Sequence, residues 1–514
     1  MNNNFANAFL RILLVLCVFV LYFVFLVERY SSVFPDSDYS NLILEGYDVL
    51  GGNIFRQGWT LTGVSFLTTD IVFFIIGVLF AGISKQSYNI SCSLMVLTLL
   101  LTLMPLVKEK FKENYSFAWL QFLTLAVVFS RYSLSVLRSH SGAFIICFIV
   151  LGLTNYMYKE MGSDLKQNIV CALGYILIVS LAAFSDPIVL IVTAAPVCIW
   201  SFIARIKKEI NDTAFLSIVL VNLSSLLLSI AMDHFYYMFG CNKNSFLEYQ
   251  SLTSIDLIGD KVCLYVKCLL MMIDSSFDMN EYKQVRLLFY PFSMAIIVVF
   301  FCFIVFNFAK FICGKEYDYL TVVLGGGFVL ISFAFIFSTV SIDINSARYF
   351  CYFPMLLAIV FLRNVFNLPR NGKAYYLVML LVFIVAIGKC ISVVNDSKID
   401  SPPQQGLAEV LKSNDLHCGY ASYWNASATT LYSDNEVRVR AVTFGDDNLY
   451  FYNWFSNSAW YEEESNFIVT SNDDPSGITP DNIIPVIGFP DDILYYDSYT
   501  ILVYDHDISS YLNC

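Results

Sequence analysis

Charged residues are scarce in this sequence: Asp, Glu, Lys and Arg make up 14% of its 514 residues, whereas hydrophobic residues make up 57%. The mean hydropathy is +0.64. Such a composition excludes an ordinary soluble globular protein. Several apolar runs reach 17 to 21 residues, long enough to cross a hydrocarbon core of about 30 Å. The composition therefore indicates a helical membrane protein that crosses the bilayer many times.

Three further absences narrow the class of protein. The 14 cysteines are scattered and form no zinc-type pair, which argues against a structural metal centre. The sequence shows no internal repeat, although many transporters are built from repeated halves. No ionisable residue lies in the middle of a predicted span, whereas ion-coupled transport usually needs one there.

Eleven membrane-spanning helices fit the apolar runs best. They are predicted at 9–27, 89–107, 115–130, 142–157, 168–184, 187–204, 213–231, 291–309, 319–339, 350–367 and 374–391. With a cytoplasmic N-terminus, every cytoplasmic loop carries at least two Lys or Arg, as the positive-inside rule requires. The run 70–84 is too short to span the membrane. Counting it as a span would reverse every later loop and place "RIKKE" at 205–209 outside. We therefore expect 70–84 to be a helix that lies in the outer interface.

The charge divides the chain into two predicted domains. Residues 393–514 contain 19 Asp and Glu against four Lys and Arg, a net charge of −15, whereas the whole chain carries −12. We therefore expect a near-neutral transmembrane module at 1–392, with external loops at 28–88 and 232–290, and a soluble acidic domain at 393–514. The patterns "VRVRAVTF", "NFIVTS" and "YTILVYD" predict strands in a small α/β domain. The acidic surface argues against nucleic acid as a partner.

Carboxylates gather just after the first predicted span, in "FPDSDYSNLILEGYDVLGGN" at residues 34–53. On a helix from Asp38 to Val49, the positions of Asp38, Glu45 and Asp48 fall close to one stripe. The stripe is either the solvated face of an interfacial helix or a carboxylate site above the membrane. At that level Asp36 or Asp38 could act as a general base for an acceptor hydroxyl that attacks a sugar C1. Sequence alone does not choose between the two aspartates.

A phosphate leaving group on a lipid would need positive charge or hydrogen-bond donors. The arginine fork matches phosphate geometry, and the predicted outer face offers Arg131, Arg138 and Arg348 together with Tyr349. An alternative role for Arg348 is an interfacial anchor.

Other acidic and aromatic residues are candidates for supporting roles. Asp186, in "AFSDPIV" between two predicted spans, either caps the next helix or orients the acceptor or holds a divalent cation. Glu45 and Asp70 are further acidic candidates. Aromatic rings can stack on sugars, and the candidates in the acidic domain are Trp424, Trp454 and Trp460. Ordinary core packing is the alternative for these three rings.

The layout resembles the GT-C glycosyltransferases, which are integral membrane enzymes that use polyprenyl-phosphate sugars. The resemblance is carried by "DSDYSNLILEGYDVLGGN", by "SDP" and "ARYF..P", and by about eleven spans followed by a soluble domain. The chain is similar in layout and size to bacterial O-antigen-modifying glucosyltransferases, although no residue-by-residue match is made. The Trp-Trp-Asp signature of oligosaccharyltransferases is absent.

The resemblance implies an all-α polytopic membrane protein with about 11 spans and a C-terminal α/β extracytoplasmic domain, in a bacterial inner membrane. It implies a polyprenyl-phosphate sugar as donor and a surface glycan or glycolipid as acceptor. A divalent cation is the one cofactor left open, and its ligands are unknown. The alternatives are a flippase or transporter for a lipid-linked sugar, a surface polysaccharide polymerase or ligase, and a membrane scaffold.

Overall fold

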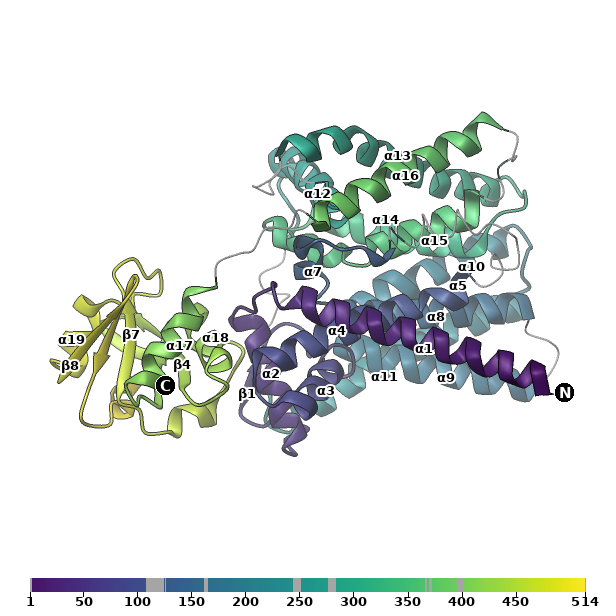
Figure 1. The fold of residues 1–514 in the computed structure, drawn as a ribbon. Coiled ribbons are helices and arrows are strands. Elements are labelled where there is room, and N and C mark those ends of the chain that lie inside the picture. The colour runs from purple at the N-terminus through teal and green to yellow at the C-terminus, as the bar shows by residue number, and fades with distance from the viewer. Residues whose placement is uncertain are drawn as a thin grey trace.

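The computed structural model describes residues 2–107, 124, 126–160, 165–243, 251–275, 283–365, 368, 372–394 and 401–513. Figure 1 shows a bundle of long helices and a C-terminal domain that contains a β-sheet. This domain lies at one end of the bundle, here called the domain-bearing end. Helix α1 (Asn2–Tyr30) begins at the opposite end of the bundle.

Seven helical segments of the described residues are long and apolar enough to cross a membrane. They are α4 (Lys85–Leu101) with α5 (Leu103–Val107), α8 (Ser141–Glu160), α9 (Leu165–Ser185), α11 (Asp212–Tyr237), α13 (Lys283–Ile312), α14 (Tyr319–Phe337) and α16 (Lys373–Val394). The polytopic helical class predicted from the sequence is therefore confirmed.

The four other predicted spans have different outcomes. The run 187–204 coincides with a shorter apolar helix, in which a π-helical turn (Leu190–Ala194) leads into α10 (Ala195–Ile206). The run 350–367 falls on a pair bent by 44°, the 3₁₀ helix η5 (Ile344–Phe350) and α15 (Phe353–Val365). The run 9–27 lies inside α1, and most of 115–130 lies outside the described residues.

Two short helices follow α1 at the domain-bearing end. They are α2 (Ser37–Leu50) and α3 (Ile71–Ala81), and they pack against each other and against α4. Helix α3 is shorter than the predicted 70–84, because Asp70 precedes it and Gly82 ends it with φ +65°. At about 1.5 Å per residue, its 11 residues span roughly 16 Å, so α3 is too short to cross a membrane. A Cβ on Gly77 would meet Ser91 Oγ at 2.1 Å, so this glycine permits the close contact with α4.

A small mixed sheet joins the bundle to the C-terminal domain. Strand β1 (Trp59–Leu61) pairs in parallel with β2 (Asn242–Lys243), and in antiparallel with β6 (Ser456–Asn457) of the C-terminal domain. Thr60 is the central residue, opposite both Asn242 and Ser456. Three distant chain segments are thereby linked through backbone hydrogen bonds.

The C-terminal domain is a three-layer α/β sandwich. Its sheet has the order β10-β5-β4-β3-β7-β9-β8. These strands are β3 (Cys418–Ala421), β4 (Arg438–Gly445), β5 (Asn448–Phe451), β7 (Phe467–Ser471), β8 (Asp492–Tyr496), β9 (Tyr499–Val503) and β10 (Leu512–Asn513). Helices α17 (Pro403–Ser413) and α18 (Tyr423–Tyr432) cover one face, and α19 (Pro480–Ile487) covers the other.

Strand alternation explains both layers of this domain. Phe467 and Val469 of β7 pack with α17 and α18, whereas Ile468 between them packs with α19, as the two-residue side-chain period of a strand requires.

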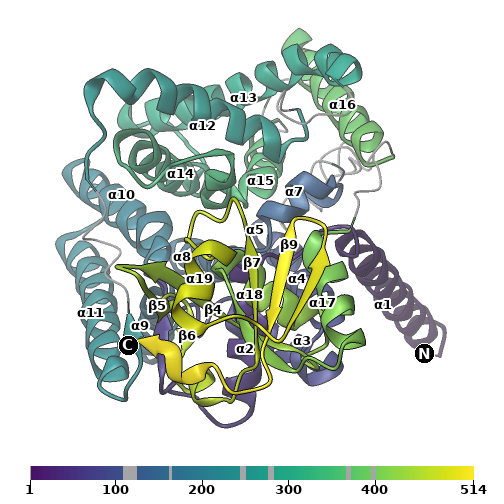
Figure 2. The same cartoon turned by 90° about the vertical axis from the view of Figure 1, so that its left-hand side faces the viewer.

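The predicted domain boundary at 392/393 falls in the last turn of α16. Two shorter helices of the bundle, α7 (Arg131–Val136) and α12 (Ile258–Met272), lie near the domain-bearing end of the bundle (Figures 1 and 2).

The topology predicted from the charges can be measured with reporter fusions. We expect a fusion at Lys208, beside Arg205 and Lys207, to report the cytoplasm, because positive residues are retained there. A fusion at Gly445 of the C-terminal domain should report the outside. An external signal at Lys208 would contradict the eleven-span arrangement.

Candidate active site

Both candidate bases lie at the start of helix α2. Asp36 is the N-cap in an extended conformation, and its Oδ1 accepts a hydrogen bond from the Tyr39 amide at 3.3 Å. An aspartate is favoured there because its oxygen satisfies an amide that has no partner within the helix. Asp38 follows in the first turn. Both aspartates are half-buried, at the domain-bearing end of the bundle.

Arg138 holds the start of α2 in place. Its Nη1 donates to the Phe34 carbonyl oxygen at 3.0 Å, and its Nη2 lies 3.3 Å from Asp36 Oδ2. The guanidinium also lies 3.7 Å from the centre of the Tyr39 ring, a favourable cation–π distance. Both oxygens of Asp36 are therefore engaged, one by the helix cap and one by Arg138.

Asp38 has a different environment from Asp36. The hydroxyl of Tyr423, which begins α18 in the C-terminal domain, donates a hydrogen bond to Asp38 Oδ1. Burial raises the pKa of Asp38 because desolvation disfavours the charged carboxylate, and the neighbouring Asp36 raises it further by like-charge repulsion. Arg348 is close enough to oppose this shift. The structure thus brings together the residues named here the rim cluster: Asp36, Asp38, Tyr39, Arg138, Arg348 and Tyr423.

Arg348 reaches the rim cluster from η5. Its guanidinium lies 5.5 Å from the centre of the Tyr349 ring. Its Nε is buried and has no hydrogen-bond partner among the residues that the structure describes. Arg131 is also buried, at the first residue of α7, and lies 5.3 Å from the centre of the Tyr132 ring.

A second group of polar side chains lies deeper and adjoins η5 through Tyr349. His140 Nδ1 and Asp186 Oδ2 are 2.6 Å apart, and both residues are buried. Asp186 Oδ1 accepts the Ile188 amide at 3.1 Å, the local turn contact expected of an Asp-Pro start. The His140 ring lies 5.4 Å from the Tyr349 ring. Asp186 therefore has both oxygens engaged by protein groups.

Asp70 belongs to the same deeper group. Its Oδ1 accepts the Gly142 amide at 3.0 Å, and its Oδ2 has no partner among the described residues. Burial raises the pKa of Asp70 to about 6, although the Gly142 hydrogen bond opposes the shift. A Cβ on Gly142 would meet the Thr69 backbone at 2.5 Å, so glycine is required for this close contact.

Glu45 and Asp48, farther along α2, lie in two other networks. Glu45 forms a fully buried ion pair with Arg56, which also donates to the Ser65 carbonyl oxygen at 2.7 Å and to Tyr236 Oη at 2.7 Å. Asp48 Oδ2 accepts hydrogen bonds from Trp59 Nε1 at 2.7 Å and Asn457 Nδ2 at 3.1 Å. Both networks fix α2 against its neighbours.

The three tryptophans differ in their exposure. Trp424 is 54% exposed, and its ring lies 5.1 Å from that of Tyr423. Trp454 is partly buried against both the bundle core and the C-terminal core. Trp460 packs edge-on against Trp59 at 4.9 Å and under Arg440 at 4.5 Å. Only Trp424 of these three presents a largely exposed ring.

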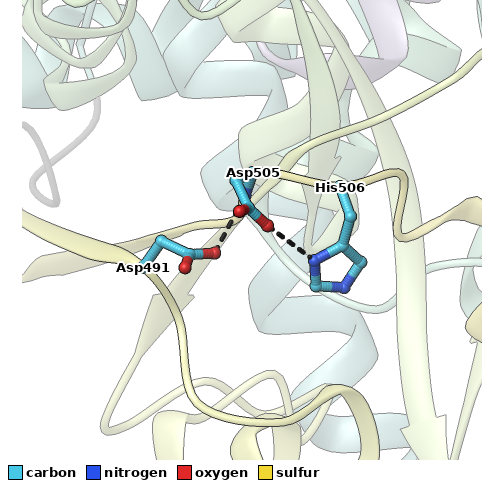
Figure 3. A group of neighbouring side chains, drawn as sticks. All are labelled: Asp491, Asp505 and His506. Atoms are coloured by element: carbon cyan, nitrogen blue, oxygen red, sulfur yellow. Dashed lines mark hydrogen bonds and ion pairs between the residues drawn. The ribbon is translucent and has the colours of Figure 1, made fainter.

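One group with metal-ligand chemistry occurs among the described residues, in the C-terminal domain. Asp491, Asp505 and His506 are exposed near the ends of β8 and β9 (Figure 3). Asp491 Oδ2 accepts the Asp505 amide at 2.9 Å, and His506 Nδ1 lies 3.2 Å from Asp505 Oδ1. These local hydrogen bonds account for the arrangement without an ion, and the divalent cation considered above stays a prediction.

Sequence reasoning missed how Tyr423 and Arg56 are used. No local pattern distinguishes Tyr423 from the other aromatic residues of the acidic domain, and its partner Asp38 is 385 residues away. Arg56 lies in the predicted external loop 28–88, and nothing in its local sequence indicates the pairing with Glu45. Residues 45–56 contain two acidic residues followed by one arginine, and this order does not specify a contact.

Comparisons with known proteins support the architecture. No protein-family model and no curated protein matches this sequence. The arrangement of membrane helices with a C-terminal domain is shared with a solved structure. The crystal structure of ArnT from Cupriavidus metallidurans in the apo state matches with a TM-score of 0.53 at 9% identity, covering 99% of this chain and 100% of that chain. At this identity the likeness establishes the fold alone.

The buried pair predicts a stability effect. We expect Arg56→Met to lower the free energy of unfolding by about 3–5 kcal/mol, because it leaves the Glu45 carboxylate buried and unpaired. The double change Arg56→Met/Glu45→Leu should recover much of this loss. Thermal unfolding in detergent measures both variants.

The matched control is Arg205→Met, since Arg205 pairs with Asp212 on a largely exposed surface. Exposed pairs contribute about 0–1 kcal/mol. Equal losses for Arg56→Met and Arg205→Met would contradict the role given to the buried pair.

Proposed function

We propose that this protein is a membrane glycosyltransferase that moves a sugar from a polyprenyl-phosphate donor to a surface glycan or glycolipid on the outer face of a bacterial inner membrane. The observation that carries the proposal is the rim cluster, where two carboxylates and two arginines meet at the domain-bearing end of a GT-C-like fold. That end would face outward in the predicted orientation.

Asp38 is the better candidate for the general base. Asp36 is held by the helix cap and by Arg138, which suits a positioning role. Asp38 accepts a hydrogen bond on Oδ1 only, so Oδ2 has no partner among the described residues. Its raised pKa makes its ionised form a stronger base, and a base is most effective when its pKa approaches the working pH.

Arg348 is the better candidate for binding the donor phosphate. The Nε atoms of Arg138 and Arg348 are both buried without a partner among the described residues. The terminal nitrogens of Arg138 already donate to Phe34 and Asp36, whereas Arg348 acts on Asp38 through its charge. A phosphate oxygen would satisfy the Nε donor of Arg348, and the guanidinium would stabilise the negative charge that develops on the leaving group. Tyr349 supports the guanidinium through its ring.

The reaction is a single displacement at the sugar C1. The acceptor hydroxyl oxygen forms the new glycosidic bond while the bond from C1 to the lipid phosphate breaks. Asp38 takes the hydroxyl proton, and the polyprenyl phosphate leaves with the electron pair beside Arg348. One attack from the opposite side inverts the configuration at C1. Since a phosphate leaves as an anion, no general acid is needed.

The acceptor would approach from the side of the C-terminal domain. The exposed ring of Trp424 beside Tyr423 can stack on a sugar face. An open hollow of about 450 Å³ adjoins the other end of α2, and its lining includes Asp48, Asn53 and Asn457. Carboxylate and carboxamide groups suit sugar hydroxyls as hydrogen-bond partners.

The first functional prediction concerns Asp38. We expect Asp38→Asn to lower kcat by about 10²–10⁴-fold, because the amide keeps the size and cannot accept the proton. Asp36→Asn should lower kcat less, since Asn remains a good N-cap. Transfer from labelled polyprenyl-phosphate sugars in proteoliposomes measures each rate.

Asp497→Asn is the matched control, because Asp497 is exposed in the turn between β8 and β9 and its φ of +50° suits Asn equally. If Asp36→Asn, Asp38→Asn and their double change all transferred sugar at the wild-type rate, neither aspartate would be the general base. If the protein moved the lipid-linked sugar across the bilayer and transferred no sugar to an acceptor, a flippase would be favoured instead.

The second functional prediction concerns the donor. A site at the outer face has no access to cytoplasmic nucleotide sugars, so the purified protein should transfer sugar only from a lipid-phosphate donor. The measurement compares labelled polyprenyl-phosphate sugars with labelled nucleotide sugars on the same acceptor preparation. Turnover of a nucleotide sugar in lipid-free detergent would contradict the proposal.

A further inference from the structure

The C-terminal domain contacts the start of α2 through one helix, α18. Three hydrogen bonds join them: Tyr423 Oη donates to Asp38 Oδ1, the Ala428 amide donates to Ser37 Oγ at 3.4 Å, and Tyr432 Oη donates to the Pro35 carbonyl oxygen at 3.2 Å. Figure 1 shows α18 between the sheet of its domain and α2. The segment with both candidate bases is therefore directly held by the soluble domain.

We infer that Tyr423 is a positioning residue that holds the carboxylate of Asp38 in its working orientation and tunes its basicity. The inference rests on the proposed function and extends it, because it makes the C-terminal domain part of the active site. Tyr423 is 6% exposed and cannot easily exchange its hydrogen bond with water. Its hydroxyl occupies Oδ1, and Oδ2 is the oxygen left for the acceptor.

The hydrogen bond changes the chemistry as well as the geometry of Asp38. Donation from Tyr423 favours the ionised carboxylate, so it lowers the pKa of Asp38 against the larger effect of burial, which raises it. The base is thereby kept ionised over a wider pH range. The other titratable or charged groups that act on this carboxylate, or are acted on by it, are Asp36, Tyr39, Arg138, Arg348 and Tyr452.

Two tyrosine variants separate positioning from simple docking. Tyr423→Phe removes the hydrogen bond to Asp38, and Tyr432→Phe removes one from the same helix to a backbone carbonyl. We expect Tyr423→Phe to lower kcat by about tenfold or more, as a hydrogen bond to a charged group can contribute that much. The acid limb of the pH profile of kcat should also move to higher pH in Tyr423→Phe. Tyr432→Phe should keep the pH profile of the wild type.

A second readout does not depend on activity. Because burial raises the pKa of Asp38 in the folded protein, ionising Asp38 lowers stability as the pH rises through that pKa. The Tyr423 bond offsets part of this loss. Tyr423→Phe should therefore unfold at a lower temperature than the wild type near neutral pH, and the difference should shrink at acidic pH. The difference in unfolding temperature between Tyr432→Phe and the wild type should stay constant with pH.

The outcomes distinguish the two proposals. If Tyr423→Phe matches Tyr432→Phe in kcat, pH profile and pH-dependent stability, the positioning role is overturned and α18 merely docks. If the wild type transfers no polyprenyl-phosphate sugar, the proposed function fails, and pH-dependent stability still decides whether Tyr423 acts on Asp38. If Asp38→Asn abolishes transfer and Tyr423→Phe leaves the pH profile unmoved, only the inference about Tyr423 is lost.

Discussion

The buried guanidinium of Arg56 is the contact on which the rest of the site depends. It joins Glu45 in the middle of α2 to the loop at Ser65 and to Tyr236 near the end of α11. A charge buried this deeply is tolerated only when it is paired and hydrogen-bonded. The pairing therefore allows little freedom to α2, and the aspartates at its first turn are held at a fixed height relative to the bundle.

From this fixed helix the site is built outward in two directions. On the bundle side, Arg138 and η5 bring positive charge against the first turn of α2. On the other side, α18 and the β1–β6 pairing attach the C-terminal domain. Charged groups are tolerated at this end because it lies outside the hydrocarbon core in the predicted orientation. The proposed reaction between a lipid phosphate and an acceptor outside the membrane would require charged groups at this level.

Local patterns predicted several elements closely. The helix expected from Asp38 to Val49 is α2 at Ser37–Leu50, and the pattern "VRVRAVTF" is β4. Helical and strand periodicities are local, so they survive any arrangement of the rest of the chain. The stripe of Asp38, Glu45 and Asp48 was a weaker guide. Its three members lie in separate networks, because neighbouring elements pack against α2 from different directions.

The sequence by itself determined the membrane class, the acidic composition of the C-terminal domain and the position of carboxylates just after the first apolar run. Hydrophobic burial and charge exclusion act on each segment separately, so composition is enough to reveal them. The tertiary structure alone decided which aspartate has a free oxygen and which arginine is paired with an aspartate. It also paired Tyr423 with Asp38, since a contact across 385 residues depends on how whole domains pack and leaves no local pattern.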